Sequence, residues 1–417
     1  MAYDVERIRQ DFPIFGRQIN GHPMVYLDSA NTAQAPRQVL DAMWEHHAWH
    51  HANVGRSLHT LGCEATDVYE EARSKVAAFV GARRAGEIVF TRNSTEAINL
   101  VAHSFGNPAN ADPRFALGPG DEILVSEMEH HSNLVPYQLL AQRTGATLRW
   151  LPLTDEGFLD LTGLDELLTP RTKLVGVVHV SNILGTVNPV ARIVARAREV
   201  GALVLLDGSQ SVPHIPVDVG ALGVDFLAFT GHKMCGPTGI GALWAHAELL
   251  AAMPPFLGGG AMVDVVTMPM TTYAPPPARF EAGTPAIAAA VGLGAAVDYL
   301  ATIGLDAIHR HEQVLLTRAL TAMADVPGLR VYGPAQPAVR GGTISFNLAG
   351  LSPQDVGDVL DSMGVLVRVG RHCAAPVCAR FGVEAMVRAS IYLYSTEAEI
   401  DALLAGLHVA RKKLARR

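Results

Sequence analysis

Short, continuous apolar runs alternate with longer helix-like segments between residues 87 and 245. Continuous runs, in contrast to strictly alternating ones, are typical of strands buried on both faces, as in a parallel sheet between two helical layers. The seven runs are EIVFT, DEILVS, TLRWL, KLVGVVHV, ALVLLD, VDFLAF and GIGALWA. The pattern therefore predicts an α/β fold whose large domain contains a mostly parallel, seven-stranded sheet.

The pattern changes near residue 285, where a Pro-rich stretch (268–285) ends and two helices separated by Gly304 are predicted. We expect the Pro-rich stretch to be an exposed excursion. From residue 330 onward, strand-like runs (GGTISFNL, GVLVRVG, VRASIYLY) alternate with helix-like segments at 354–363 and 396–413. This mixture predicts a smaller α+β domain.

We accordingly place the large domain at residues 21–299 and the small domain at 300–417. The N-terminal residues 1–20 contain one short helix candidate, at 5–11, which is too short to be stable alone. We therefore expect this segment to pack on the small domain.

The charge balance disfavours one class of partner. The chain has 417 residues with 33 basic and 40 acidic side chains, a formal net charge of −7, and its basic residues cluster only at the last few positions. A protein whose main partner is a nucleic acid normally carries a basic patch. We therefore expect no nucleic-acid partner.

Membrane insertion and secretion are also disfavoured by the sequence. The longest apolar stretch, 286–297, is shorter than the roughly 20 residues that a bilayer span needs. The first residues, MAYDVERIRQDF, lack the apolar core of a secretory signal. Four cysteines in so long a chain do not form a disulfide framework. We expect a cytoplasmic protein with no membrane partner.

Polar residues stand at the ends of two of the apolar runs. Asp207 ends ALVLLD and Gln210 follows it, and Thr230, His232 and Lys233 follow VDFLAF. Ligands of open α/β sheets bind at such carboxyl ends. A desolvated lysine amine can form a Schiff base, and a neighbouring aspartate can keep a pyridine nitrogen protonated. Without the strand context, a helix-capping Asp207 and a solvated Lys233 would be the simpler interpretation. With it, the pair predicts a pyridoxal 5′-phosphate (PLP) site.

The segment TRNSTEAINLVAHSF offers a place for the phosphate of such a cofactor. We expect Ser94 or Thr95 to be the N-cap of a helix that follows the strand EIVFT. The amides at a helix N-terminus bind anions. An ordinary capped helix is the alternative, and the position after a strand of the sheet favours the phosphate site.

A pair of histidines, His130 and His131, follows the strand DEILVS. An imidazole there can stack on a planar ring. Metal binding is the alternative, but adjacent histidines do not easily share one ion, and no acidic or cysteine partner stands at a ligand spacing. We expect stacking on the cofactor and no metal site.

Eight motifs stand in an order and spacing that point to a known family: RNSTEAINL, EMEHHSNLVPYQ, HVSNILGT, DGSQSVPH, TGHKMCGPTGIG, RFEAGTP, RVGRHCA and VRAS. With them the chain resembles the cysteine desulfurases of the sulfur-mobilisation (Suf) type, or group II, in the class V aminotransferase family of fold-type I PLP enzymes. The resemblance covers nearly the whole chain from LDSANTAQAP onward. It implies PLP as cofactor, L-cysteine as substrate, a homodimer and a Suf-type sulfur-acceptor protein, in iron–sulfur cluster or thio-cofactor assembly.

The resemblance also implies roles for residues around the cofactor ring. Lys233 would form the Schiff base, Asp207 would pair with the pyridine nitrogen, and Gln210 would contact the ring hydroxyl. His130 would stack on the ring and take part in catalysis. The residues that would bind the phosphate are Ser94, Thr95, Thr230, His232 and, from the partner subunit of the dimer, Thr284.

At the substrate, the resemblance implies that Asn182 and Arg388 hold the carboxylate, that Arg368 and Arg56 line the pocket, and that Cys373 attacks the sulfur. Two positions differ from the pattern that is frequent in the family. Arg371 and Gly55 stand where the family often has histidine, before His-Cys and before Arg56. Neither difference removes a core catalytic group.

The surroundings of Cys373 support the same role independently. It follows an apolar strand in RVGRHCAAP, beside Arg371 and His372 and near Arg368. We expect these neighbours to form a cationic setting, which favours a reactive thiolate. A buried structural cysteine is the alternative, and we assign that role to Cys63, Cys235 and Cys378.

A fold alone does not determine a reaction. The nearest alternatives are other class V PLP enzymes: a selenocysteine lyase acting on L-selenocysteine, an epimerase or a transaminase. A catalytically idle scaffold or cargo protein is the alternative from another class of function. The presence of both Lys233 and Asp207 favours an enzyme.

Overall fold

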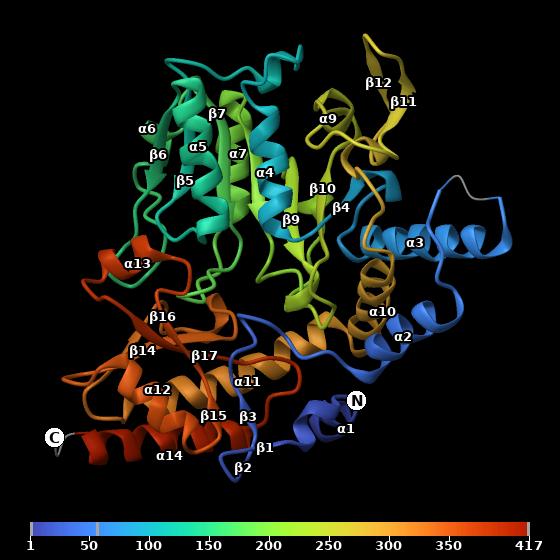
Figure 1. Ribbon diagram of the computed structural model, residues 1–417. Helices are drawn as coiled ribbons and strands as arrows, with labels where there is room; N and C mark the ends of the chain where they lie inside the picture. Colours follow the sequence, from blue (N-terminus) through green and yellow to red (C-terminus); the bar gives the residue numbers. More distant parts are fainter. Residues whose placement is uncertain (1–2, 56–57, 415–417) are drawn as a thin grey trace.

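A seven-stranded sheet forms the centre of the larger part of the protein (Figure 1). The computed structural model describes residues 3–55 and 58–414. The strand order is β4-β10-β9-β8-β7-β5-β6; β10 is antiparallel to both of its neighbours, and the pairs from β9 to β6 are parallel. The strands are β4 (Ile88–Thr91), β5 (Glu122–Ser126), β6 (Thr147–Leu151), β7 (Thr172–Val178), β8 (Leu203–Asp207), β9 (Phe226–Thr230) and β10 (Gly241–Ala245). The predicted mostly parallel, seven-stranded sheet is confirmed.

Helices cover both faces of this sheet, because successive strand side chains alternate between two apolar clusters. In β8, Val204 packs in one cluster and Leu205 in the other. Ile193 lies in the first cluster, and Ile98 and Leu140 lie in the second. The helices of this part are α2 (Arg37–Trp49), α3 (Thr60–Phe79), α4 (Ser94–Ser104), α5 (Val135–Thr144), α6 (Leu164–Leu167), α7 (Val190–Val200), α8 (Val219–Leu222), α9 (Ala247–Ala252) and α10 (Ile287–Ile303).

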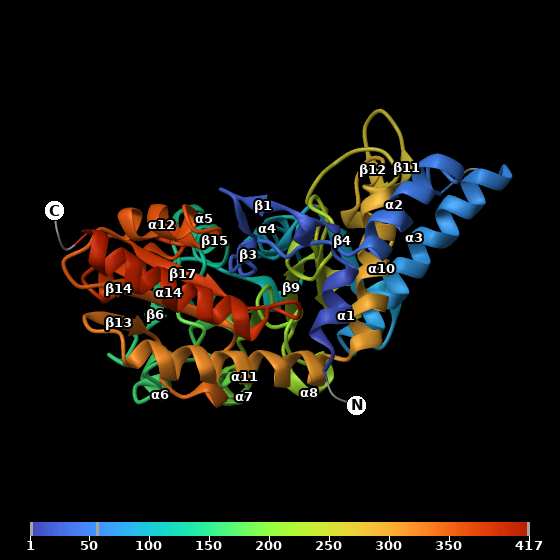
Figure 2. The same cartoon turned by 90° about the horizontal axis from the view of Figure 1, so that it is seen from below.

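The C-terminal part contains a four-stranded antiparallel sheet of order β13-β14-β17-β16. Its helices α11 and α14 contact each other, as Figure 2 shows. The elements are α11 (Leu305–Ala324), β13 (Leu329–Tyr332), β14 (Thr343–Leu348), α12 (Pro353–Asp361), β15 (Val365–Leu366), β16 (Arg368–Gly370), α13 (Ala375–Arg380), β17 (Met386–Ser390) and α14 (Glu397–Leu414). The predicted mixture of strands and helices is confirmed here.

The N-terminal segment contacts both parts. The Tyr3 hydroxyl donates to the Leu393 carbonyl at 2.7 Å, and the Tyr299 hydroxyl of α10 donates to Asp11 at 3.0 Å. The elements are α1 (Val5–Gln10), β1 (Gln18–Ile19), β2 (His22–Pro23) and β3 (Val25–Tyr26). β3 pairs with β15, so it belongs structurally with the C-terminal part. The division of the chain at residue 299 stays a prediction.

Gly304 separates α10 from α11 as expected, and it adopts a φ of +87° that favours glycine. In the described ranges, no single helix is long and apolar enough to cross a membrane. Only α10 and α11 taken together, bent by 72° at their break, have the length and composition for it.

The Pro-rich stretch divides into two halves. Its first half contains β12 (Thr271–Tyr273), which pairs with the preceding β11 (Val263–Val266) in a hairpin that projects from the protein, with Met268 fully exposed (Figure 1). From Phe280, which is buried, the chain returns to the protein surface and enters α10. The expected excursion is confirmed for the first half only.

Candidate active site

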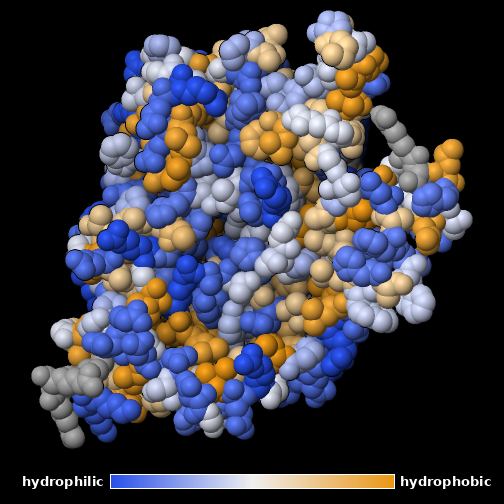
Figure 3. Space-filling model, in the orientation of Figure 1, coloured by the Kyte–Doolittle hydropathy of each residue, from blue (hydrophilic) through white to orange (hydrophobic). Residues whose placement is uncertain are grey.

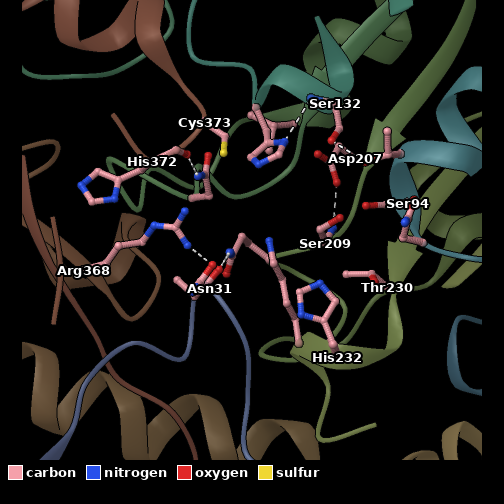
Figure 4. Close-up of a pocket in the computed structure, with 18 of the residues that line it drawn as sticks. Asn31, Ser94, Ser132, Asp207, Ser209, Thr230, His232, Arg368, His372 and Cys373 are labelled. Carbon is pink, nitrogen blue, oxygen red and sulfur yellow. Dashed lines mark hydrogen bonds between the residues drawn. The ribbon is translucent and has the colours of Figure 1, made fainter. Parts of the chain in front are cut away.

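A cavity of about 200 Å³ lies at the carboxyl ends of β5, β7, β8 and β9, at the start of α4 and below the loop between β16 and α13. Figure 4 shows it from within. It is lined by twelve of the predicted site residues: Ser94, Thr95, His130, Asn182, Asp207, Gln210, Thr230, His232, Lys233, Arg368, Cys373 and Arg388. Residues spread over almost 300 positions of the chain therefore meet in one place.

The pair that predicted the cofactor lies on neighbouring parallel strands. Asp207 ends β8 and is buried, and its Oδ1 accepts a hydrogen bond of 2.9 Å from the Ser209 amide. Lys233 ends a short 3₁₀ turn directly after β9. Burial lowers the pKa of Lys233 to about 8, although the nearby Asp207 opposes this shift. About one-tenth of the Lys233 amine is therefore unprotonated at pH 7, far more than for an ordinary lysine.

Unsatisfied donors and hydroxyls gather at one end of the cavity. The Asn93 side chain, which accepts from the Glu96 amide, is the N-cap of α4. The expectation of Ser94 or Thr95 at the cap is wrong by one residue, because Asn93 has the extended backbone that a cap requires. The cap leaves the first amides of the helix, including those of Ser94 and Thr95, directed to the cavity.

Two buried hydroxyls lie near this helix start. In the part of the chain that the structure describes, Ser209 Oγ and Thr230 Oγ1 have no hydrogen-bond partner. Figure 4 shows both with Ser94 and Asp207 on the same side of the cavity. Unpaired buried hydroxyls are costly unless a ligand satisfies them. Together with the helix N-terminus they fit a phosphate, so the residues present suit PLP.

The two adjacent histidines have different positions. His130 lines the cavity, and its Nδ1 accepts from the Ser132 amide at 3.1 Å. Burial, with a contribution from Lys233, lowers the pKa of His130 to about 3, so the ring is neutral. His131 instead contacts the loop of Cys373: its amide donates to the Cys373 carbonyl at 2.7 Å, and its Nε2 accepts from the Ala375 amide. Only His130 is placed to stack on a cofactor.

The N-terminal segment 30–33 forms one wall of the site. The Gln210 amide nitrogen donates to the Ala30 carbonyl at 2.7 Å, and the Ala33 amide donates to the His232 carbonyl at 2.8 Å. His232 Nδ1 lies 3.2 Å from Thr32 Oγ1. Gln210 keeps its oxygen and one N–H, and His232 keeps Nε2, for contacts with a ligand.

Two arginines lie at the other end of the cavity. The Arg388 guanidinium, 2% exposed, donates to the Asn182 carbonyl at 3.0 Å and to Asp28 Oδ1 at 3.2 Å, while its Nε has no partner among the described residues. Burial lowers the pKa of Arg388 to about 10, so it stays charged at neutral pH. Arg368 donates to the Asn31 side chain. These cations fit a substrate carboxylate.

Cys373 lies in a tight turn between β16 and α13. His372 and Cys373 both adopt left-handed backbone, with φ of +50° and +53°, which costs of order 1–3 kcal/mol each in non-glycine residues. The turn is held by the His131 amide on the Cys373 carbonyl and by Asn182 Nδ2 on the His372 carbonyl, both at 2.7 Å. The surrounding structure thus fixes an otherwise unfavourable turn that presents the thiol to the cavity.

The expected source of positive charge near Cys373 is partly wrong. Burial lowers the pKa of His372 to about 3, and its Nε2 donates to the Met386 carbonyl at 2.9 Å, so the ring is neutral. Figure 4 shows this ring directed away from the sulfur of Cys373. Arg371 is exposed and donates to the Glu384 carbonyl. The basic side chains that line the same cavity as Cys373, besides neutral histidines, are Lys233, Arg368 and Arg388.

One predicted residue, Thr284, is not part of this cavity, and another, Arg56, cannot be placed. Thr284 is exposed and lines a second cavity of about 880 Å³, which shares Asn93 and His232 with the first; its Oγ1 accepts from Asn53 at 3.2 Å. Arg56 lies outside the described residues. The role of either residue stays a prediction.

The structure adds residues that the sequence reasoning missed. Asp28 and Asn31 contact the two arginines, Ser132 pairs with Thr95 through their hydroxyls at 2.6 Å, and Ser209 lines the cavity. Asp28 and Asn31 belong to the motif LDSANTAQAP, whose polar residues were the only signal in the sequence.

Comparisons with known proteins agree with this geometry. A family model described as aminotransferase class-V matches residues 25–403. A probable cysteine desulfurase of Streptomyces coelicolor is 58% identical over 98% of this chain and 97% of its own length. The structure of the Escherichia coli cysteine desulfurase CsdA, in an S-sulfonic acid form, has a TM-score of 0.90 at 38% identity, covering 99% of this chain and 100% of that one.

A more distant solved structure carries the cofactor. It is a C-DES variant with glycine covalently linked to PLP, with a TM-score of 0.81 at 25% identity over 96% of this chain and 98% of that one. The fold and the lysine–aspartate site define a fold-type I PLP enzyme. The chain belongs to the class V aminotransferase family and is, within it, a PLP-dependent cysteine desulfurase.

Proposed function

We propose that the residues of this cavity convert L-cysteine to L-alanine and leave a persulfide on Cys373. The observation that carries this assignment is that the Cys373 thiol, the Lys233 amine and the Arg388 guanidinium line one cavity, opposite a set of phosphate-binding groups. Lys233 is far from both Cys373 and Arg388 in the sequence.

Each side chain has a separate role in the proposed reaction. Arg388, Asn182 and Arg368 hold the substrate carboxylate, and Lys233 removes the α-proton. Bound PLP supplies the electron sink that makes this proton removable. Cys373 then attacks the substrate sulfur: the S–S bond forms as the Cβ–S bond breaks. The electron pair of that bond stays on the substrate carbon, which takes up a proton to complete alanine.

The test is product analysis with L-cysteine and purified holoenzyme. We expect alanine and a protein-bound persulfide in equal amounts in the first turnover. A racemised substrate or a keto acid would instead indicate an epimerase or a transaminase, and preferential turnover of L-selenocysteine would indicate a selenocysteine lyase. No turnover would support an idle scaffold.

Arg388→Ala should weaken the binding of L-cysteine without loss of PLP. A charge-assisted hydrogen bond contributes about 1.5–3 kcal/mol, so the Kd for cysteine should rise about ten- to a hundredfold. Arg371→Ala is the matched control, because Arg371 is exposed and lies outside the cavity lining. An unchanged KM, under conditions where KM reports binding, would place the carboxylate site elsewhere.

The capture of PLP by the apoprotein should depend on pH through Lys233. Because burial lowers its pKa to about 8, the reactive free amine is about one-tenth of the total at pH 7 and about nine-tenths at pH 9. The rate at which the bound-cofactor absorption band appears should therefore rise with an inflection near pH 8. An inflection near the value of an ordinary lysine would show that the cavity does not desolvate this amine.

The proposal includes a homodimer. Trp44 and Trp49 of α2 and Leu61 at the start of α3 are large apolar residues exposed in the single chain, and a second copy would bury them. Figure 3 shows apolar surface on the β11–β12 hairpin and where α3 begins. Thr284, outside its own chain's cavity, would then serve the phosphate of the partner's cofactor. Sedimentation of the holoenzyme should give the mass of two chains.

The sulfur on Cys373 must leave for another thiol. We propose that the acceptor is a Suf-type protein with its own cysteine, which serves iron–sulfur cluster or thio-cofactor assembly. We also propose a cytoplasmic location. All four cysteines lie in the described residues and none is in a disulfide, which suits a reducing compartment. Acceleration of alanine formation by a candidate acceptor is the test of that partner.

A further inference from the structure

Glu281, in the motif RFEAGTP, is a nearly buried carboxylate that accepts four hydrogen bonds. Its Oε1 accepts from Arg73 Nη1 at 2.6 Å and from the Phe90 amide at 2.7 Å. Its Oε2 accepts from Arg73 Nη2 and from the Tyr69 hydroxyl, both at 2.9 Å. The carboxylate thus ties the chain at residue 281 to α3 and to β4 at once.

Its main partner, Arg73, is itself fixed. The guanidinium is 2% exposed, donates to the Ile88 carbonyl at 2.9 Å and lies over the Phe90 ring at 4.7 Å. Burial by itself lowers the pKa of Arg73, but the Glu281 carboxylate more than reverses this, and the net shift is upward. A bidentate, buried pair of this kind fixes geometry, and removing one partner leaves the other uncompensated.

The segment held by this pair, residues 281–285, carries Thr284 three positions after Glu281. Gly283 adopts a φ of +83° and donates to the Gly260 carbonyl at 2.9 Å, and α10 begins at Ile287. The backbone is therefore fixed on both sides of Thr284. Thr284 is exposed and points to the second cavity, outside the cavity that contains Lys233 of its own chain.

We infer that Glu281, through its bonds to Arg73, Phe90 and Tyr69, is a positioning residue for Thr284 and thereby for the cofactor site of a second copy of this chain. The inference rests on the proposed function, in which Thr284 binds the phosphate in the partner's site. It has a particular consequence: loss of Glu281 harms the site of the partner chain and spares the site of its own chain.

Mixed dimers test this consequence. Dimers that pair a Lys233→Ala chain with a Glu281→Gln chain are isolated through two different tags. In such a dimer only the cofactor site of the Glu281→Gln chain keeps Lys233. That site receives Thr284 from the other chain, whose Glu281 is intact. We expect this site to bind PLP with the parent's Kd, and the dimer to hold one lysine-bound cofactor, counted by absorbance. The Glu281→Gln homodimer should show a Kd about ten- to a hundredfold higher.

The reverse arrangement gives the opposite expectation. A chain with both Lys233→Ala and Glu281→Gln is paired with an unmodified chain, whose site is the only one with a lysine. That site now receives a misplaced Thr284, so its Kd for PLP should rise as in the Glu281→Gln homodimer. A Lys233→Ala chain paired with the unmodified chain should keep the parent's Kd.

Two further variants guard against a folding defect in Glu281→Gln: one is a control that should change nothing, and the other is a milder test of the same contact. Glu70→Gln removes another carboxylate from Arg73, one whose side chain is about half exposed, and should leave the Kd for PLP unchanged. Tyr69→Phe removes one donor to Glu281 and keeps the ring. It should raise the Kd several-fold in the same pattern across the mixed dimers, and it carries the test if Glu281→Gln does not fold.

Mixed dimers that pair a Thr284→Ala chain with a Lys233→Ala chain distinguish a failure of this inference from a failure of the proposed role of Thr284 across the dimer. If they bind PLP as weakly as the Thr284→Ala homodimer, the role of Thr284 across the dimer fails. If they regain the parent's Kd while the Glu281→Gln pairing does not, Glu281 acts within its own chain and the inference is overturned.

Discussion

Replacing Cys373 by alanine should abolish persulfide formation and lower sulfur release from L-cysteine more than about a thousandfold, as the loss of a catalytic nucleophile does elsewhere. Binding of PLP and of cysteine should persist, because Lys233, Asp207 and Arg388 are untouched. Mass spectrometry of the enzyme after one turnover measures the persulfide, and alanine analysis measures the turnover.

The other three cysteines provide matched controls. Cys235 and Cys378 are buried, and burial raises the pKa of both thiols, that of Cys378 despite the opposing effect of Arg371. Cys63 is exposed on α3, away from the cavity lining. Each alanine variant of these cysteines should keep substantial activity. A persulfide found on Cys378 or Cys235 of the parent would show that the nucleophile is misassigned.

Lys233→Ala should remove both the lysine-bound cofactor band and the exchange of the substrate α-proton with solvent, again by more than about a thousandfold. The reason is that, among the described residues, no other lysine lines the cavity. Visible absorbance of the purified protein and proton exchange followed by NMR measure the two effects.

Lys173→Ala is the control for this variant, since Lys173 is partly exposed on β7 and donates to the Pro170 carbonyl. It should be yellow and active. If Lys233→Ala kept a lysine-bound cofactor, the assignment of the cofactor lysine would be refuted.

The neutral state of His372 changes the account of the nucleophile. The sequence places two basic residues directly before Cys373, and both were expected to favour its thiolate. In the structure, one is neutral and buried and the other is exposed. The basic residues that share the cavity with Cys373 are Lys233, Arg368 and Arg388, which bind cofactor and substrate in the proposed function.

The sequence by itself determined the sheet and the two residues that define the chemistry. Strands buried on both faces need continuous apolar runs. Asp207 ends one such run and Lys233 comes shortly after another, so their place at the carboxyl edge follows from local order alone. Helix positions were also predictable, because their periodicity is local. The N-cap of α4 was misplaced by one residue, since Asn93, Ser94 and Thr95 are all competent caps and only the backbone distinguishes them.

The tertiary structure decided what depends on burial and on contacts far apart in the chain. Asp28 reaches Arg388 across 360 positions, and Asn31 reaches Arg368 across 337. The charge state of His372 depends on its desolvation, which no neighbour in the sequence reveals. The resemblance implied a role for Thr284 in the partner's site, but only the structure places it outside its own chain's cavity, on a segment that the Glu281–Arg73 pair binds to α3.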